Sequence, residues 1–311
     1  MKHTSVLLEE SIAALQIKPE GIYVDATLGR GGHSKKILEK LTTGHLYGID
    51  KDEAAIKASD AILKEINSLY TLIHADFKDL KNRLGALGVD KIDGILFDLG
   101  VSSPQFDDPE RGFSYRFEAR LDMRMDQRQE KTAYDVVNFY SFAELMRIFR
   151  EYGEEPNAKL IARAIEKARM IQPITTTFEL VEIIKTALPQ KTLKKKGHPA
   201  KQVFQSLRLE VNQELEELDE VLRQAANMLN VDGCAAVISF HSLEDRIVKR
   251  VFQSLTKIEQ VDKRIPVLAA EIAQAKYELQ SRKPIVAKAE ELEENPRAKS
   301  AKLRAIKRLE E

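Results

Sequence analysis

The stretch DATLGRGGHS, residues Asp25 to Ser34, decides the fold. It begins at the end of a strand-like run at 22–26, contains Gly29, Gly31 and Gly32, and leads into a helical pattern. Glycines let the backbone come close to a ligand, and the free N–H groups at the start of a helix point toward it. A glycine-rich turn between a strand and a helix is typical of an α/β fold. Alone it fits either a nucleoside-cofactor site or a tight turn required by packing, and an acid spaced downstream favours the cofactor site.

Outward from this turn, short β-branched runs alternate with helical patterns of about a dozen residues. This alternation is typical of a parallel sheet covered by helices on both faces. We predict strands at 22–26, 45–50, 72–75 and 92–99, with helices at 34–41, 53–66 and 78–86. The fold class is therefore predicted to be a doubly wound α/β sheet.

After Pro104 the pattern becomes helical, and strand character returns only at 234–240, before a helix that opens at Ser242 with a capping box. Helices are predicted at 141–152, 157–170, 177–187 and 202–229. The predicted organisation is a discontinuous domain of residues 1–108 and 230–311, interrupted by a helical substrate-recognition insertion at 109–229. Residues 277–286 and 301–306 favour an edge hairpin over a helix.

Composition excludes several classes of protein. The 311 residues are 43% hydrophobic and 32% charged, which is typical of a globular chain, and the 49 basic and 49 acidic residues cancel. The single cysteine, Cys234, excludes an intrachain disulfide framework, and the histidine spacing predicts no metal site. No signal-peptide pattern or run of 18 apolar residues is present, so we expect a cytoplasmic chain without a membrane span.

Acidic residues stand at the predicted strand ends. Asp50 follows the glycines by about twenty residues, where a carboxylate suits the two hydroxyls of a ribose. Asp98 ends the fourth strand on the same expected edge, and Phe77 could cover an adenine ring. An anionic neighbour for an ammonium group favours S-adenosylmethionine as the cofactor. Asp76 fits either ligand contact or the N-cap of the following helix.

The fourth strand runs into Ser103-Pro104-Gln105-Phe106, which resembles the Ser-Pro-Pro-Tyr turn of amino methyltransferases. Fixed carbonyl groups in such a turn can orient an amino group whose lone pair is delocalised into a base, and Phe106 could stack on that base. Ser103, Pro104 and Phe106 are therefore candidate catalytic residues, with no catalytic base assigned. A type I turn followed by a core phenylalanine explains the same residues.

Basic residues are grouped in blocks. Residues 190–209 and 297–308 each hold six Lys or Arg without an acid, and five arginines lie between 111 and 128. A solvated helix face explains any one block, but the three together favour a polyanion, RNA or DNA. Phe113, Tyr115 and Phe117 could stack on unpaired bases, whereas Phe204 is expected to face the core. The candidate RNA-binding residues are Arg124, Lys194, Lys195, Lys196, His198, Lys201 and Arg208.

The assembled motifs resemble one family along nearly the whole chain, from His3 to Arg304. They include HTSVLLEE, DATLGRGGHS, GIDKD, FDLGVSSPQFDDPERGFSYR, LDMRMD, GEEPNAKLIARAI, GHPAKQVFQSLRLEVN, ISFHSLEDRIVK and NPRAKSAKLR. Together they resemble the bacterial 16S rRNA (cytosine-N4)-methyltransferase family, called MraW or RsmH. The resemblance implies a class I S-adenosylmethionine-dependent methyltransferase sheet with an inserted helical domain.

The same resemblance implies methylation of a cytidine amino group in the decoding region of 16S rRNA, within the small ribosomal subunit, and allows a homodimer. It implies cofactor contacts by Gly31, Gly32, His33, Asp50, Phe77, Asp98 and Gln105. The chain departs from the family pattern at Ser5, where proline is usual, and over 256–280. Neither departure is expected to touch the cofactor site.

Two other functions fit part of the pattern. The glycine turn with Asp50 also suits a nicotinamide-dependent oxidoreductase. The basic blocks suit a non-catalytic RNA-binding module that has kept a nucleotide-binding fold.

Overall fold

The computed structural model describes residues 5–257 and 275–310. The chain forms two compact units, one of Met1–Gly100 and Glu217–Glu311, the other of Val101–Glu216. The changes between units lie after Gly100 and Glu216, whereas the sequence placed them after residues 108 and 229. The second difference arises because helix α12 (Leu218–Met228) packs its apolar side chains with the sheet of the first unit.

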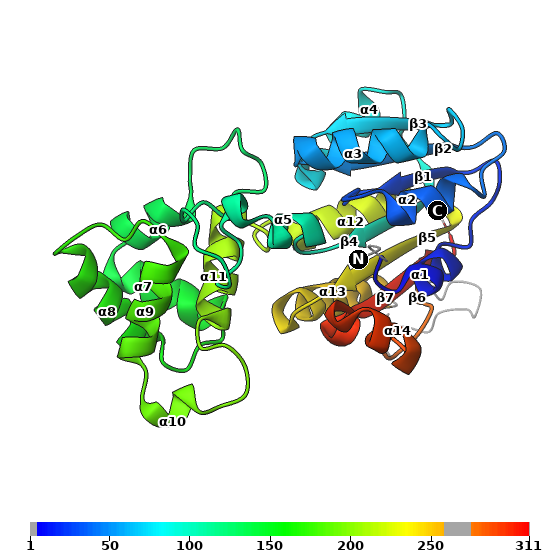
Figure 1. The fold of residues 1–311 in the computed structure, drawn as a ribbon. Coiled ribbons are helices and arrows are strands. Elements are labelled where there is room, and N and C mark those ends of the chain that lie inside the picture. Colours follow the sequence, from blue (N-terminus) through cyan, green and yellow to red (C-terminus); the bar gives the residue numbers. More distant parts are fainter. Residues whose placement is uncertain (1–4, 258–274, 311) are drawn as a thin grey trace, which may run out of the picture. The chain divides into compact units, whose positions relative to one another are not determined.

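A mixed sheet is the centre of the first unit (Figure 1). Its strands are β1 (Ile22–Asp25), β2 (His45–Asp50), β3 (Tyr70–His74), β4 (Ile92–Asp98), β5 (Leu229–Ser239), β6 (Tyr277–Leu279) and β7 (Lys302–Arg308). Their order is β3-β2-β1-β4-β5-β7-β6. The first five in this order run parallel, and β7 is antiparallel to both β5 and β6. The predicted α/β fold is confirmed.

Helices cover both faces of this sheet. One face packs with α1 (Leu8–Leu15), α2 (Gly32–Leu38) and α3 (Glu53–Leu63), and Figure 1 shows α2 and α3 in front of the strands. The other face packs with α4 (Leu80–Gly85), α12 and α13 (Ser242–Leu255). Each helix buries one apolar stripe, which is why their sequences show spacings of three and four residues.

The C-terminal strands β6 and β7 pair antiparallel at the edge of the sheet, as the hairpin interpretation predicted. Their connection includes helix α14 (Ala289–Glu294) and the 3-10 helix η4 (Pro296–Ser300). The departure from the family pattern at 256–280 lies mostly outside the described residues.

The second unit is built from helices and irregular loops. They are α5 (Ser103–Asp107), η2 (Pro109–Arg111), α6 (Ala133–Phe139), α7 (Phe142–Glu151), α8 (Ala158–Arg169), α9 (Thr177–Ala187), α10 (Gln190–Leu193) and α11 (Lys201–Asn212). It has its own core, to which Phe149, Ile161 and Leu207 contribute. The single helix predicted at 202–229 is wrong, because Gln213 adopts a left-handed conformation with φ 50° and ends α11.

Within the described residues, no helix is both long and apolar enough to span a membrane.

Candidate functional site

The candidate site lies at the carboxyl ends of the central strands of the first unit. Strands β1 and β4 are neighbours although they are not consecutive, so the chain winds outward from them in opposite directions. Ligands of open α/β sheets bind at this switch point, beyond the carboxyl ends of the strands. The adjacent strands β2, β1 and β4 end at Asp50, Asp25 and Asp98. Three carboxylates therefore share one edge of the sheet.

The glycine turn connects β1 to α2. Gly29 and Gly31 have φ angles of 52° and 70°, a region that side chains disfavour. A Cβ atom on Gly31 would also come within 3.0 Å of Ser59 Oγ. The Ser59 hydroxyl donates a hydrogen bond of 3.0 Å to the Gly29 carbonyl, which fixes the turn from the α3 side. The sequence thus requires glycine at these positions to bring the bare backbone to the sheet edge.

Ser5 lies directly against this turn. A Cβ atom added to Gly32 would clash with Ser5 Oγ. The expectation that the departure at Ser5 stays away from the predicted site is therefore wrong. A motif comparison could not show this, because the contact joins residues 27 positions apart in the sequence.

Asp25 stabilises the glycine turn through hydrogen bonds. Its carboxylate accepts a hydrogen bond of 2.7 Å from the Ser34 hydroxyl and one of 3.2 Å from the Thr27 backbone N–H. The side chain is 1% exposed, and burial raises its pKa from 3.8 to about 6. Sequence reasoning did not single out Asp25, although its place at the end of β1, before the glycines, was a usable signal.

Asp50 links the end of β2 to the same turn. One carboxylate oxygen accepts from the Gly29 N–H at 2.8 Å, and the other accepts from the Asp52 N–H at 2.8 Å. Burial raises the pKa of Asp50, while these two backbone donors oppose the shift. Each oxygen keeps a second lone pair, so the carboxylate remains able to accept from the hydroxyls of a ligand.

Asp98 has an incomplete set of hydrogen-bond partners. Its Oδ2 lies 3.8 Å from His33 Nδ1, whereas Oδ1 is buried without a hydrogen-bond partner among the described residues. Burial raises its pKa well above the usual value, and the nearby carboxyls of Asp25 and Glu244 add to the shift. A buried carboxylate in this state gains most from a cationic or hydrogen-bond-donating ligand.

His33 is fixed between the N-terminal segment and Asp98. The ring is buried, and its Nε2 lies 3.2 Å from the Val6 carbonyl. It is the second residue of α2, directly after Gly31 and Gly32. The HTSVLLEE motif therefore has a structural role here, because it supplies the carbonyl that orients this ring.

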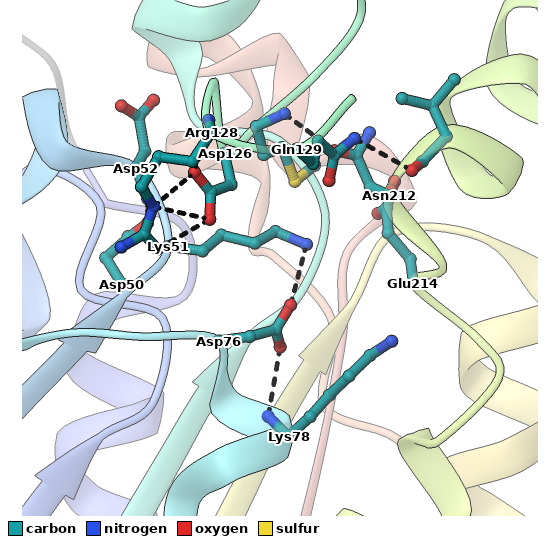
Figure 2. A network of polar contacts seen from close by, with 12 residues as sticks. Asp50, Lys51, Asp52, Asp76, Lys78, Asp126, Arg128, Gln129, Asn212 and Glu214 are labelled. Atoms are coloured by element: carbon teal, nitrogen blue, oxygen red, sulfur yellow. Dashed lines mark hydrogen bonds and ion pairs between the residues drawn. The ribbon is translucent and has the colours of Figure 1, made fainter. Parts of the chain in front are cut away.

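Phe77 and Asp76 follow β3. Phe77 begins the 3-10 helix η1 (Phe77–Asp79), is partly buried, and makes an edge contact with Phe97 at 6.0 Å. Asp76 caps η1 by accepting from the Lys78 N–H at 3.1 Å, and it lies 3.5 Å from Lys51 Nζ (Figure 2). Of the two interpretations of Asp76, the N-cap is therefore confirmed.

The residues at this edge fit S-adenosylmethionine. The cofactor carries a sulfonium, an ammonium and a ribose, and the edge provides a glycine turn, the acceptor Asp50 and the unsatisfied carboxyl of Asp98. Among the described residues, no three His, Cys, Asp or Glu side chains are grouped so that they could hold a metal ion.

The Ser-Pro segment belongs to the second unit. Ser103 and Pro104 begin α5, so this segment is helical and not an isolated type I turn. Gln105 is 7% exposed, and its Oε1 accepts from the Ser102 N–H at 3.0 Å. Phe106 is half-buried and packs on the core of the second unit. The core interpretation of Phe106 is therefore the one that the contacts favour.

Two of the candidate RNA-binding arginines are held by contacts within the second unit. Arg124 donates to Asp122 at 2.7 Å and to the Gln129 carbonyl at 2.8 Å. Arg208 donates from Nε to Glu214 at 2.8 Å. In contrast, Lys194, Lys195, Lys196 and Lys201 are exposed. His198 stacks on Tyr115, and Phe113 and Phe204 are buried in the core, as expected for Phe204.

The basic block at 297–308 forms ion pairs within the first unit. Most of it is strand β7, where Arg304 Nε lies 2.7 Å and Lys302 Nζ 3.1 Å from the Asp245 carboxylate. Lys307 pairs with Asp232 at 2.7 Å, and Arg308 donates to the Leu229 carbonyl at 2.8 Å. The charge of this block is thus largely compensated by the fold, which removes it as an argument for a polyanion.

Asp245 is therefore an ion-pair residue, and the cap of α13 differs from the predicted one. His241, not Ser242, is the N-cap, and it forms a capping box with Glu244. Glu244 is 2% exposed and contributes to the raised pKa of Asp98. The sequence signal was a His-x-x-Glu spacing, which resembles the common Ser-x-x-Glu box.

Comparison with known proteins decides the family. The model of the MraW methylase family matches residues 1–309. The chain belongs to this family. Its methyl donor is S-adenosylmethionine, and the predicted class I methyltransferase fold is confirmed. The nicotinamide-dependent alternative and the non-catalytic alternative find no support in this membership.

Two relatives share about half of their residues with this chain. Ribosomal RNA small subunit methyltransferase H of Lactiplantibacillus plantarum is 52% identical over 311 residues, covering 99% of this chain and 97% of the relative. The protein of the same name from Streptococcus dysgalactiae subsp. equisimilis is 54% identical over 310 residues, covering 99% and 98%. Among solved structures, an rRNA methylase from Streptococcus thermophilus aligns with a TM-score of 0.42 at 12% identity, covering 100% of this chain and 99% of that one.

Proposed function

We propose that this chain transfers the methyl group of S-adenosylmethionine to the N4 amino group of one cytidine in the decoding region of 16S rRNA. The observation that carries the proposal is membership of the MraW methylase family together with two relatives above 50% identity named ribosomal RNA small subunit methyltransferase H. The motif resemblance supplies the finer statement about the cytidine amino group and the decoding region. A reaction on ribosomal RNA would take place in the cytoplasm.

In this proposal the cofactor-binding residues are Gly31, Gly32, His33, Asp50, Phe77, Asp98 and Gln105. The glycine turn brings backbone close to the ligand, Asp50 accepts from the ribose hydroxyls, and Asp98 faces a positively charged group. The unpartnered Oδ1 of Asp98 and the positive φ angles of Gly29 and Gly31 support these roles.

The chemistry of the site is mainly a matter of placement. S-adenosylmethionine supplies an electrophilic methyl group on its sulfonium. The protein has to hold the amino nitrogen in line with that methyl group, since its lone pair is delocalised into the ring. We assign no catalytic base, because the amine proton can leave to water after the transfer. Ser103, Pro104 and Phe106 remain candidates for orienting the base.

A radioactive transfer assay tests the proposal. Small and large ribosomal subunits from cells that lack this protein are incubated with the enzyme and S-adenosylmethionine labelled on the methyl group. Label is expected in small-subunit rRNA only, and Asp50→Ala should lose both cofactor binding and transfer. Label in large-subunit rRNA, or in neither subunit despite cofactor binding, would reject the proposed substrate.

A further inference from the structure

Two aromatic rings stack in parallel on loops of the second unit. The centroids of Tyr115 and His198 are 4.1 Å apart with an interplanar angle of 7°. The buried Phe204 meets Tyr115 edge-on at 5.7 Å and supports the pair from the core. Tyr115 and His198 themselves are only half-buried. The pair is therefore supported from the core and remains partly open to ligands.

The histidine of this pair is a neutral ring with a defined proton. Its Nδ1 accepts a hydrogen bond of 3.2 Å from the Ala200 N–H, so the proton resides on Nε2. Burial lowers the pKa of His198, and the charges of Lys185 and Arg116 lower it further. Throughout the part of the chain that the structure describes, Nε2 has no hydrogen-bond partner.

Cationic residues adjoin the pair: the charges of Lys185 and Arg116 act on His198, and four lysines lie within four residues of it along the chain. Arg116 and the lysines at 194, 195, 196 and 201 have exposed side chains without a carboxylate partner in the described ranges, whereas Lys185 is paired with Glu182 at 2.7 Å. Figure 1 shows the segment around α10, which contains the three consecutive lysines, extending from the helices between α9 and α11. An aspartate in place of His198 would cap the same backbone N–H and neutralise part of this charge. The chain has an uncharged aromatic ring there instead.

A flat ring that bears a proton donor, surrounded by uncompensated cations, matches the chemistry of a nucleotide. We propose that the Tyr115–His198 pair is the binding site for an unpaired nucleotide of the RNA substrate, whose base continues the stack while Arg116 and the lysines contact its phosphates. This inference rests on the proposed function and adds a defined recognition site to it. Such a site would bind unpaired RNA in preference to duplex RNA, because the faces of paired bases are already stacked inside the duplex.

Two variants separate this role from a structural one. His198→Asn keeps an acceptor for the Ala200 N–H but removes the ring, and His198→Phe keeps the ring but removes the acceptor. The probes are a fluorescein-labelled single-stranded RNA with the decoding-region sequence and the same RNA paired in a duplex, both measured by anisotropy. Wild-type protein should prefer the single strand. His198→Asn should bind the single strand about tenfold more weakly and the duplex unchanged, while His198→Phe should retain the preference.

Two results with these variants would overturn the inference. In the first, the His198→Asn variant binds both RNAs as the wild type does. In the second, the His198→Phe variant loses as much single-strand affinity as the His198→Asn variant, although its thermal unfolding is unchanged. Loss of binding to whole small subunits without loss on naked RNA would assign the pair to a protein contact, which also rejects it. The methyl-transfer assay separates this inference from the proposed function. If the wild-type protein methylates small subunits and the His198→Asn variant has the same KM, only the stacking site is rejected. If the wild-type protein is inactive, the proposed function is rejected.

Discussion

At the scale of single residues, the site combines buried carboxyls with a turn that only glycine can make. Asp98 has one oxygen without a partner among the described residues, and burial together with the nearby carboxyls of Asp25 and Glu244 raises its pKa. Such a cluster is unfavourable for the protein alone and becomes favourable when a cation binds. This arrangement predicts a measurable coupling between protonation and cofactor binding.

Binding of S-adenosylmethionine should release protons. The raised pKa of Asp98 means that the free protein holds this proton to a higher pH than an ordinary aspartate does, and a positively charged cofactor favours the ionised form. Affinity should therefore rise with pH up to the pKa of the free site and then level off. Calorimetry in two buffers of different ionisation enthalpy should give different apparent enthalpies.

Asp98→Asn should remove that buffer dependence and bind the cofactor more weakly, whereas Asp79→Asn, which changes an exposed acid of the same unit, should retain both properties. Identical apparent enthalpies for the wild-type protein in the two buffers would contradict this role of Asp98.

Alanine at Gly31 should lower cofactor affinity more than it lowers stability. Gly88 has a similar φ angle, 76°, but lies in open space, so Gly88→Ala provides the matched control. Both variants should lose about 1 kcal/mol of unfolding free energy, because each forces a side chain into the left-handed region, and the close contact with Ser59 adds to the loss in Gly31→Ala. Only Gly31→Ala should also weaken binding of S-adenosylmethionine, measured by calorimetry. Equal cofactor affinity of the two variants would mean that the glycine turn does not contact the cofactor.

At the scale of elements, the sequence predicts a boundary well where residues at that boundary determine it. Strand β2 and helix α9 match their predicted limits, since the apolar pattern of each ends where the element ends. The break between α11 and α12 was missed because the left-handed residue is Gln213, and neither glycine nor proline marks the place. Strand β5 starts five residues before the predicted position, through the half-buried Asn230 and the exposed Val231 and Asp232.

The same limit applies to the site residues, because only those marked by their own place in the sequence could be predicted. Asp50 and Asp98 could be predicted because they stand at strand ends. The contacts of Ser5, Ser59 and Glu244 could not, because each comes from a segment distant in the sequence. The ion pairs of β7 likewise depend on the position of Asp245 in α13.

The ion pairs of strand β7 indicate that its basic residues stabilise the folded state. The Arg304 and Asp245 side chains are 11% and 14% exposed, so Arg304→Ala leaves a largely buried carboxylate with one cation fewer. Unfolding free energy in urea should fall by about 1–3 kcal/mol. RNA affinity, measured by filter binding under native conditions, should change by less than about twofold. A loss of RNA affinity without a loss of stability would restore this block to the RNA-binding surface.

At the scale of the whole molecule, most of the proposed cofactor-binding residues lie in one unit, and the exposed lysines proposed to bind RNA lie in the other. The first unit holds the glycine turn and the acidic edge, and the second holds the exposed lysines around α10. The net charge of zero gives no general attraction to RNA, so affinity must depend on such local groups.

Reversing Lys194, Lys195 and Lys196 to Glu should weaken RNA binding at least tenfold and reduce its salt dependence, with unchanged affinity for S-adenosylmethionine. Reversal of Lys40, Lys64 and Lys81, three exposed lysines of the first unit, applies the same change of charge and serves as the control. Equal losses in the two triple variants would mean that net charge, and not the α10 segment, determines RNA binding.

The central claim is methylation of one cytidine amino group, and mass mapping of the modified rRNA tests it most directly. Small subunits from cells that lack this protein are incubated with the enzyme and S-adenosylmethionine, and the 16S rRNA is digested and fragmented by mass spectrometry. We expect one added methyl group, on the base of a single decoding-region cytidine at N4. A methyl group on a ribose, on another base or at several positions, or no added mass despite cofactor binding, would contradict it.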